Sequence, residues 1–428
     1  MSIAIETIQV LEEIVKDIPI GTNLALLHLL WAMVSGAFLQ SRGALFGALQ
    51  VAGFSARQIR RCSQAVRCGA WKMEDLIQSW QNYLLTQEDL EVRRYGGYTP
   101  LAADITAFFR PKLKGKIGKF FHHIANKAIK GIGIGLIVMV GEVEGRRIPL
   151  IREILPAEGD MSQAQLKREL LTLVSSCLKE DEVAVYDGGA SIGDMQNAKV
   201  ERYVVRLPIN CTARRNYLPP QERGRPREYG EIVRPIARSY KGRILPSTSP
   251  SLQGEFSFEG RKIKCSGWKD LLRNDQKVSE AEESFNIWVF HDPLYRTPLV
   301  LGTNMDVEPK VIFQLYHDRW VVEEVPLVAK QLLGLARGFL FSTKGRVRLP
   351  QLALLAANIL SYLACVFPPL PTGFWDRKPK RTPGRLRRVL AREGFSKDYP
   401  LDGRIRKKES VTYHLPKGVK AHRRKRAA

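Results

Sequence analysis

The chain has 428 residues, 44% of them hydrophobic, and its 67 lysines and arginines exceed its 43 acidic residues to give a formal net charge of +24. This length and hydrophobic content exclude a mainly disordered chain and allow two or three domains with their own cores. A positive excess of this size predicts a polyanionic partner, either nucleic acid or an anionic membrane surface.

The positive charge is unevenly distributed. Residues 376–428 contain 19 Lys/Arg against five Asp/Glu, and residues 110–130 contain seven Lys/Arg and no acid. A basic chain end can be a solvated, partly disordered tail. A basic segment inside a folded region is harder to explain in that way.

The six cysteines are scattered without a C-x-x-C pair, which argues against a zinc site or disulfide framework and favours a reducing compartment. No secretory signal is visible at the N-terminus. The apolar stretches 24–39 and 349–367 are a little short for spanning a membrane and contain His28 and Asn358. We therefore expect two buried helices, no membrane partner and a cytoplasmic protein.

Apolar residues recur at helical spacing from residue 1 to about 95, which predicts an all-helical N-terminal domain. Within it, residues 44–67 have the pattern of two helices joined by a tight turn at Gly53, with Ser55 as the N-cap of the second. Arg57, Arg60 and Arg61 lie on that second helix and are candidate DNA-binding residues. The pattern fits a helix-turn-helix or, equally, a helical hairpin with a basic face.

Strand-like segments begin near residue 98. The expected order is strand, strand, strand, helix, strand, helix, strand, with a turn at Glu144-Gly145, and it predicts an α/β fold in which helices cover a mixed sheet. This first part of a core domain covers residues 96–210. Residues 211–285 resemble a β-rich basic insertion, residues 286–372 resume the core, and residues 373–428 form a basic C-terminal tail.

Two acids stand where apolar strands are expected to end, Asp104 in LAADIT and Asp187 in VAVYDGG. Each alone is explained by capping of a turn or helix. On neighbouring strands they could instead hold a divalent cation through carboxylate oxygens. Asp181 and Asp194 are nearby alternatives to Asp187, but neither directly ends the apolar strand.

Residues 316–330, YHDRWVVEEVPLVAK, supply a possible third acid. On one helix, Tyr316, Arg319, Glu323 and Lys330 fall within an arc of about 60°, whereas Glu324 falls outside it. A carboxylate among a phenol, a guanidinium and an ammonium suits metal and phosphate together. The simpler alternative is a surface Arg319–Glu323 pair, worth about 0.3–0.5 kcal/mol.

The spacing Tyr-x2-Arg-x3-Glu-x6-Lys at these four residues resembles the signature of the bacterial insertion-sequence DDE transposases. The surrounding PLVLGTN, QLYHDRWVVEE and KQLLGL are similar to that family too. The resemblance covers roughly residues 98–340 and matches Asp104 and Asp187 to the family's two catalytic aspartates. It implies a ribonuclease-H-like core interrupted by the β-rich insertion, and an N-terminal module that recognises transposon ends.

The resemblance further implies that Asp104, Asp187 and Glu323 are catalytic and bind two Mg²⁺ or Mn²⁺ ions, with Tyr316, Arg319 and Lys330 on DNA phosphates. The expected reaction is hydrolysis at the element ends and joining of the freed 3′-hydroxyl to target DNA by a homodimer at the bacterial nucleoid, with a DNA hairpin as one possible intermediate. The alternatives are a metal-dependent nuclease of the same fold and a catalytically dead DNA-binding remnant. Pro326, three residues beyond Glu323, is expected to kink the helix before Lys330.

Overall fold

The computed structural model describes residues 2–220, 226–405 and 419. The chain divides into two compact units, residues 1–86 with 329–428 and residues 87–328. This division departs from the boundaries expected near residues 95 and 372. The apolar segment expected to complete the core domain belongs with the N-terminal helices instead.

The first unit is all-helical in its described part. Its helices are α1 (Ile3–Val15), α2 (Asn23–Val34), α3 (Ala37–Gln40), α4 (Leu45–Val51), α5 (Ala56–Cys68), α6 (Met73–Leu85), α11 (Thr343–Val366) and α12 (Pro383–Glu393). α12 packs against α1 and α11, so the region expected to be a tail begins with a folded helix. The rest of that tail, residues 406–418 and 420–428, lies outside the described residues.

The central helix of this unit is α11. Among the described residues it alone is long and apolar enough to cross a membrane by length and composition, and 89% of its most apolar window is buried. It contacts α2, α5 and α6, and the Trp80 indole N–H donates to the Asn358 side-chain oxygen at 2.8 Å. The two apolar stretches are thus buried helices, as expected from their sequence.

The predicted pair of helices at residues 44–67 is present as α4 and α5. Gly53 lies between them with a φ of +80°, a conformation that glycine adopts without strain. Ser55 caps α5 in a capping box with Gln58. Arg57 and Arg60 are exposed and Arg61 is half-buried, so the second helix has a basic outer side.

The second unit is built on a mixed sheet. Its strands are β1 (Glu91–Val92), β2 (Thr99–Phe109), β3 (Lys119–His122), β4 (Lys127–Val143), β5 (Arg146–Pro156), β6 (Glu182–Tyr186), β7 (Tyr203–Arg206), β8 (Ala213–Arg215), β9 (Ile232–Val233), β10 (Arg238–Tyr240), β11 (Arg243–Leu245), β12 (Leu252–Phe258), β13 (Arg261–Leu272), β14 (Phe285–His291) and β15 (Leu299–Thr303). The helical elements are α7 (Gln163–Cys177), α8 (Ile192–Asn197), η1 (Val278–Glu280), α9 (Pro309–Asp318), α10 (Val321–Leu327) and the π-helix η2 (Val328–Leu332), during which the chain passes to the first unit.

Thirteen of the described strands form one sheet. Its first half runs β5, β4, β2, β6, β7, in which β4 is antiparallel to β5 and β2, while β2, β6 and β7 are parallel to one another. The second half continues through β15, β14 and β13 with antiparallel pairing, and β8 to β13 lie in the expected insertion. Between residues 99 and 206 the predicted strands and helices are present in the predicted order, with one further short strand, β3, that was not predicted. The predicted turn at Glu144-Gly145 is also present, and both of its φ angles are positive.

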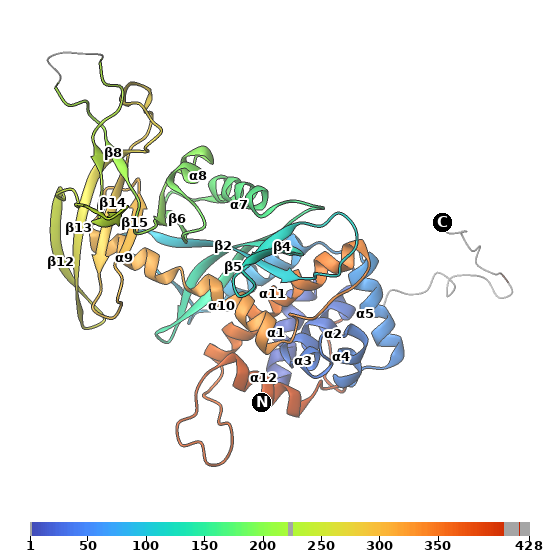
Figure 1. Ribbon diagram of the computed structural model, residues 1–428. Helices are drawn as coiled ribbons and strands as arrows, with labels where there is room; N and C mark the ends of the chain where they lie inside the picture. The colour runs from blue at the N-terminus through green and yellow to red at the C-terminus, as the bar shows by residue number, and fades with distance from the viewer. Residues whose placement is uncertain (1, 221–225, 406–418, 420–428) are drawn as a thin grey trace. The chain divides into compact units, whose positions relative to one another are not determined.

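Helices cover both faces of the central strands (Figure 1). On one face, Leu170 of α7 packs in a core with Ala184 of β6. On the other, Phe313 of α9 packs with Val183 and Val185 of the same strand. The alternation of side chains along β6 thus separates an α7 face from an α9 face.

Residues 316–330 do not lie on one helix, contrary to the expectation on which the angular comparison rested. α9 ends at Asp318, and α10 begins at Val321. Pro326 lies inside α10, where it lacks the N–H that would bond to the carbonyl of Val322, and the backbone widens into η2 two residues later. The interruption at residues 319–320 was not predicted, whereas the irregularity after Pro326 was.

Candidate active site

Three strand positions that lie side by side in the sheet carry the first charged residues of the candidate site. Ala103 of β2 pairs with Tyr186 of β6, and Tyr186 pairs with Val205 of β7. The next residue on each parallel strand is therefore Asp104, Asp187 and Arg206. The sequence suggested that Asp104 ends its strand. Asp104 lies within β2 instead, one residue beyond the last residue of β2 that pairs with β6.

The two aspartates point to the face that α9 and α10 cover. Leu101 and Ala103 belong to the core on the α7 side, so Asp104 projects to the opposite side of β2. Asp187 follows Tyr186, which also belongs to the α7 core, and so projects with Asp104. α9 contacts β2, β6 and β7, while α10 contacts β2, β4 and β5.

The break between α9 and α10 brings three side chains of the sequence signature to these aspartates. The Tyr316 hydroxyl donates a hydrogen bond to Asp187 Oδ1 at 2.9 Å. Arg319 Nη1 lies 2.8 Å from Glu323 Oε1, and its Nη2 lies 3.7 Å from Asp187 Oδ2. Arg206 Nη1 lies 3.6 Å from Asp187 Oδ1 on the open side, where the Arg206 side chain is 51% exposed.

The protonation of the two aspartates reflects these neighbours. Burial raises the pKa of Asp104 to about 6, and Glu323 and Asp187 act in the same direction while Arg319 opposes them. Burial also acts to raise the pKa of Asp187, but Arg319, the Gly188 N–H and Tyr316 hold that pKa below its ordinary value. Asp104, Asp187 and Glu323 therefore form one electrostatic group around the buried guanidinium of Arg319.

The donor set suits a hard divalent cation, because it consists of three carboxylates. Among the residues that the structure describes, however, no three His, Cys, Asp or Glu side chains are grouped as they would be around a metal ion. Arg319, whose side chain is only 6% exposed, supplies the positive charge between Asp187 and Glu323. A cation would fit the chemistry of these carboxylates, but it would compete with Arg319 for them.

The alternative acids have other partners. Asp181 pairs with Arg94 at 2.9 Å, and Asp194 caps α8 while it pairs with Lys167 at 2.8 Å. Burial raises the pKa of Glu324, and the charge that opposes this shift comes from Arg147 rather than from Arg319. The geometry therefore favours Asp187 and Glu323 over their neighbours.

The remaining predicted residues lie elsewhere in the chain. Lys330 is half-buried in η2 and belongs to the first unit, as do Arg57, Arg60 and Arg61 of α5. Their contribution to DNA binding stays a prediction. Trp268 is buried and its N–H donates to the carbonyls of Thr248 and Ser249, so it is a core residue.

Two features of the site were missed in the sequence. Arg206 could have been found, because YVVR ends the strand after VAVYD and parallel neighbours end at the same edge. The other is Asp318, which is fully buried and accepts from the Tyr95 hydroxyl at 2.6 Å and Arg93 Nε at 2.8 Å, with Arg147 Nε at 3.1 Å. Its partners are distant in sequence and gave no signal.

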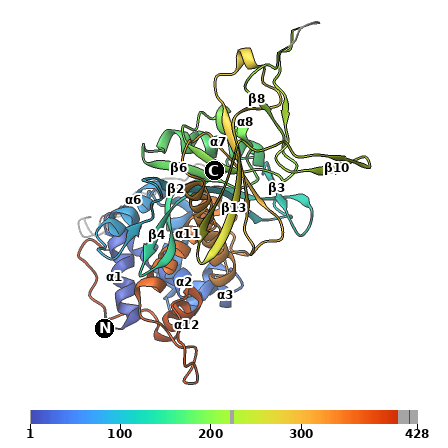
Figure 2. The ribbon, with the colours of Figure 1, turned by 90° about the vertical axis from the view of Figure 1, so that its left-hand side faces the viewer.

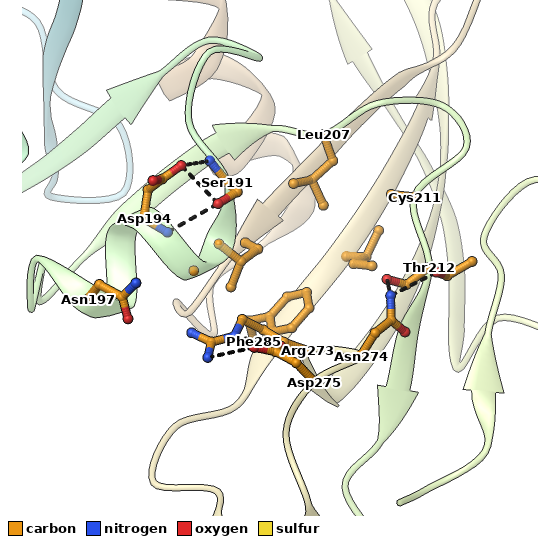
Figure 3. Close-up of a pocket in the computed structure, with 13 residues that line it drawn as sticks. Ser191, Asp194, Asn197, Leu207, Cys211, Thr212, Arg273, Asn274, Asp275 and Phe285 are labelled. Atoms are coloured by element: carbon orange, nitrogen blue, oxygen red, sulfur yellow. Dashed lines mark hydrogen bonds and ion pairs between the residues drawn. The ribbon is translucent and has the colours of Figure 1, made fainter. Parts of the chain in front are cut away.

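A cavity of about 430 Å³ lies apart from these carboxylates, beside α8 and the loop after β13 (Figure 3). Its lining includes Asn197, Arg273, Asn274 and Phe285. Asp194, the alternative to Asp187, lines it, but Asp104, Asp187 and Glu323 do not. The charged group at the strand ends is therefore the stronger candidate for chemistry.

Comparison with known proteins found no family model that matches the chain and no curated protein similar to it. What can be said of function therefore rests on the sequence signature and on the geometry of the candidate site.

Proposed function

We propose that this chain is a metal-dependent DNA transposase of the insertion-sequence type, with a ribonuclease-H-like core formed by the second unit. The observation that carries the proposal is the meeting of Asp104, Asp187 and Glu323 around Arg319. These residues are far apart in the chain, and the sequence motifs alone predict that they belong to one site. The order β5, β4, β2, β6, β7, with one antiparallel and one parallel half, supports the same fold.

In this proposal Asp104, Asp187 and Glu323 would hold two Mg²⁺ or Mn²⁺ ions. Such ions activate a hydroxyl nucleophile and stabilise the leaving oxygen of a phosphodiester. Tyr316 orients the Asp187 carboxylate through its hydrogen bond. Arg206 and Arg319 place two guanidinium groups beside the same carboxylate, where they can bind phosphate oxygens.

A cleavage assay tests this proposal. The full-length protein with Mg²⁺ or Mn²⁺ should nick DNA that carries the inverted repeats flanking its gene, and it should join the freed ends to a target duplex. Asp104→Asn, Asp187→Asn and Glu323→Gln should each abolish nicking while DNA binding persists. Glu324→Gln is the matched control and should keep activity. Full nicking by any of the three variants would remove that residue from the site.

A DNA-binding remnant is the second candidate. It is favoured by one observation, that Arg319 already compensates the charge of Asp187 and Glu323. A remnant would bind the inverted repeats without nicking them in either metal. A nuclease of the same fold would nick the DNA and fail to join the ends.

A further inference from the structure

Residues 110–130, here called the basic arm, lead out from β2 and return into β4. The arm leaves the sheet where Phe109 of β2 pairs with Gly131 of β4, continues as a loop, and then forms the short β3–β4 hairpin (Figure 2). Asp104 lies six residues before Arg110 on β2. At about 3.3 Å per residue, the base of the arm is about 20 Å along the strand from Asp104.

The root of the arm is held firmly against the sheet unit. Phe120 is buried and packs in a small core with Ala107 of β2 and Leu166 of α7. The Phe121 N–H donates to Gln163 Oε1 at 2.9 Å, at the start of α7. The arm therefore projects from a fixed base rather than from a loose loop.

The arm carries five exposed lysines, namely Lys112, Lys114, Lys116, Lys119 and Lys127. Within the described chain, none of the five makes an ion pair with a carboxylate. Lys119 stands directly opposite Lys130 in the hairpin, a pairing of like charges that costs stability. An arrangement of this kind is explained if a polyanion supplies the missing negative charge.

The tip of the arm exposes an aliphatic side chain. Ile124 is 95% exposed in the turn between β3 and β4, and Phe121, which lies in β3 before this turn, is 43% exposed. The turn has its own hydrogen bonds, from the Asn126 N–H to the His123 carbonyl and from the Ala125 N–H to His122 Nδ1. An ordered turn thus holds an aliphatic side chain in solvent, on the same arm as the exposed lysines.

We propose that the basic arm binds duplex DNA, with its lysines on phosphates about half a helical turn from the reacting bond and Ile124 against the base or sugar edges of a groove. This inference rests on the proposed function. A distance of about 20 Å corresponds to about six base pairs, because B-DNA rises about 3.4 Å per pair. Basic two-stranded ribbons enter DNA grooves, and aliphatic side chains at such positions wedge against base steps.

The test measures how binding of the full-length protein to a fluorescein-labelled duplex of mixed sequence depends on salt, in EDTA to prevent cleavage. Each phosphate contact contributes about 0.9 to the slope of log K against log salt concentration. The triple variant Lys112→Gln, Lys114→Gln, Lys116→Gln should reduce the magnitude of the slope by up to about 3. Ile124→Ser should weaken binding about tenfold and leave the slope unchanged, because it removes apolar contact without charge.

The matched control is Lys262→Gln, Lys269→Gln, Lys277→Gln, which removes the same charge from the same unit. These lysines already pair with Glu255, Asp306 and Glu228 respectively, at 2.7–3.3 Å. Their replacement should change the slope by less than 1.

The outcomes separate the arm from the proposed function. If the wild-type protein binds duplex DNA and the arm triple variant has an unchanged slope, the arm inference is overturned and the transposase proposal stands. If the wild-type protein does not bind duplex DNA, both fail. The protein can also be tested for binding to phosphatidylserine vesicles. If both arm variants lose vesicle binding but keep the wild-type affinity and salt slope for DNA, the arm is a membrane anchor and the inference is overturned.

Discussion

The buried carboxylate of Asp318 is expected to be the main electrostatic support of the helix break that places Arg319 and Glu323. Asp318 is the last residue of α9 and has no solvent exposure. It accepts from Tyr95 and Arg93 and pairs with Arg147, so three segments converge on it. Burial and Asp318 raise the pKa of Tyr95 to about 12, so its hydroxyl keeps the proton that it donates. The substitution Asp318→Asn preserves the volume and removes the charge.

The expected cost is about 3 kcal/mol in the free energy of unfolding. Removal of one partner from a buried ion pair typically costs about 3–5 kcal/mol, because the other charge is left uncompensated. The lower end applies here, since the Arg93 and Arg147 side chains are 21% and 29% exposed and keep Glu142 and Glu259 as partners. In a unit of this size, about 3 kcal/mol corresponds to a fall in Tm of about 6–12 °C.

Urea unfolding, followed by tryptophan fluorescence, measures this cost. The control is Asp306→Asn, which removes an acid that is 77% exposed and paired with Lys269, and should change stability by less than about 0.5 kcal/mol. Nicking activity of folded Asp318→Asn should also fall, because Arg319 is the next residue. A change below about 0.5 kcal/mol for Asp318→Asn would refute the reasoning.

Three further outcomes are expected at the site. Tyr316→Phe removes the hydrogen bond to Asp187 and should lower the nicking rate about tenfold without loss of DNA binding; an unchanged rate would exclude an orienting role. Arg319→Gln removes the guanidinium that competes with a cation for the carboxylates, so Mg²⁺ should bind about tenfold more tightly, which adds about 1.4 kcal/mol. The rise in Tm on adding Mg²⁺ should therefore be a few degrees larger than in the wild-type protein. Equal rises in Tm would count against competition. Burial raises the pKa of Asp104 from 3.8 to about 6, so in EDTA the stability that this carboxyl contributes below about pH 4 is lost as the pH rises to about 6. Asp104→Asn should flatten that part of the pH profile, by up to about 3 kcal/mol, and a profile that it leaves unaltered would contradict the shift.

The central strands could be predicted because their pattern is local. The segments that became β2, β4, β5 and β6 are apolar runs bounded by turn residues, and Glu144-Gly145 is a local hairpin signal. The α7 helix has its own capping box at Ser162. None of these assignments required knowledge of distant partners.

The division of the chain could not be predicted from local pattern. α11 is mainly apolar from Leu349 to its end, and such a helix can complete either a sheet or a helical bundle. It packs with α2, α5 and α6 through contacts such as Trp80 to Asn358, which join residues far apart in sequence. The break at residues 319–320 also lacks a local cause, because neither Arg319 nor Trp320 is a helix breaker. Tyr316, Arg319 and Glu323 were grouped correctly, although the straight helix assumed for the grouping was wrong.

Arg319 affects whether folding of the second unit depends on a bound metal ion. A cluster of carboxylates usually needs a metal ion or bound protons before it can be buried, which ties folding to the supply of either. Here the chain carries its own counter-charge at the junction of α9 and α10. Burial of these carboxylates in the second unit therefore does not require a bound metal ion. In the proposed function, ion binding would follow folding, and a DNA phosphate that draws the Arg319 guanidinium away from the carboxylates would favour it.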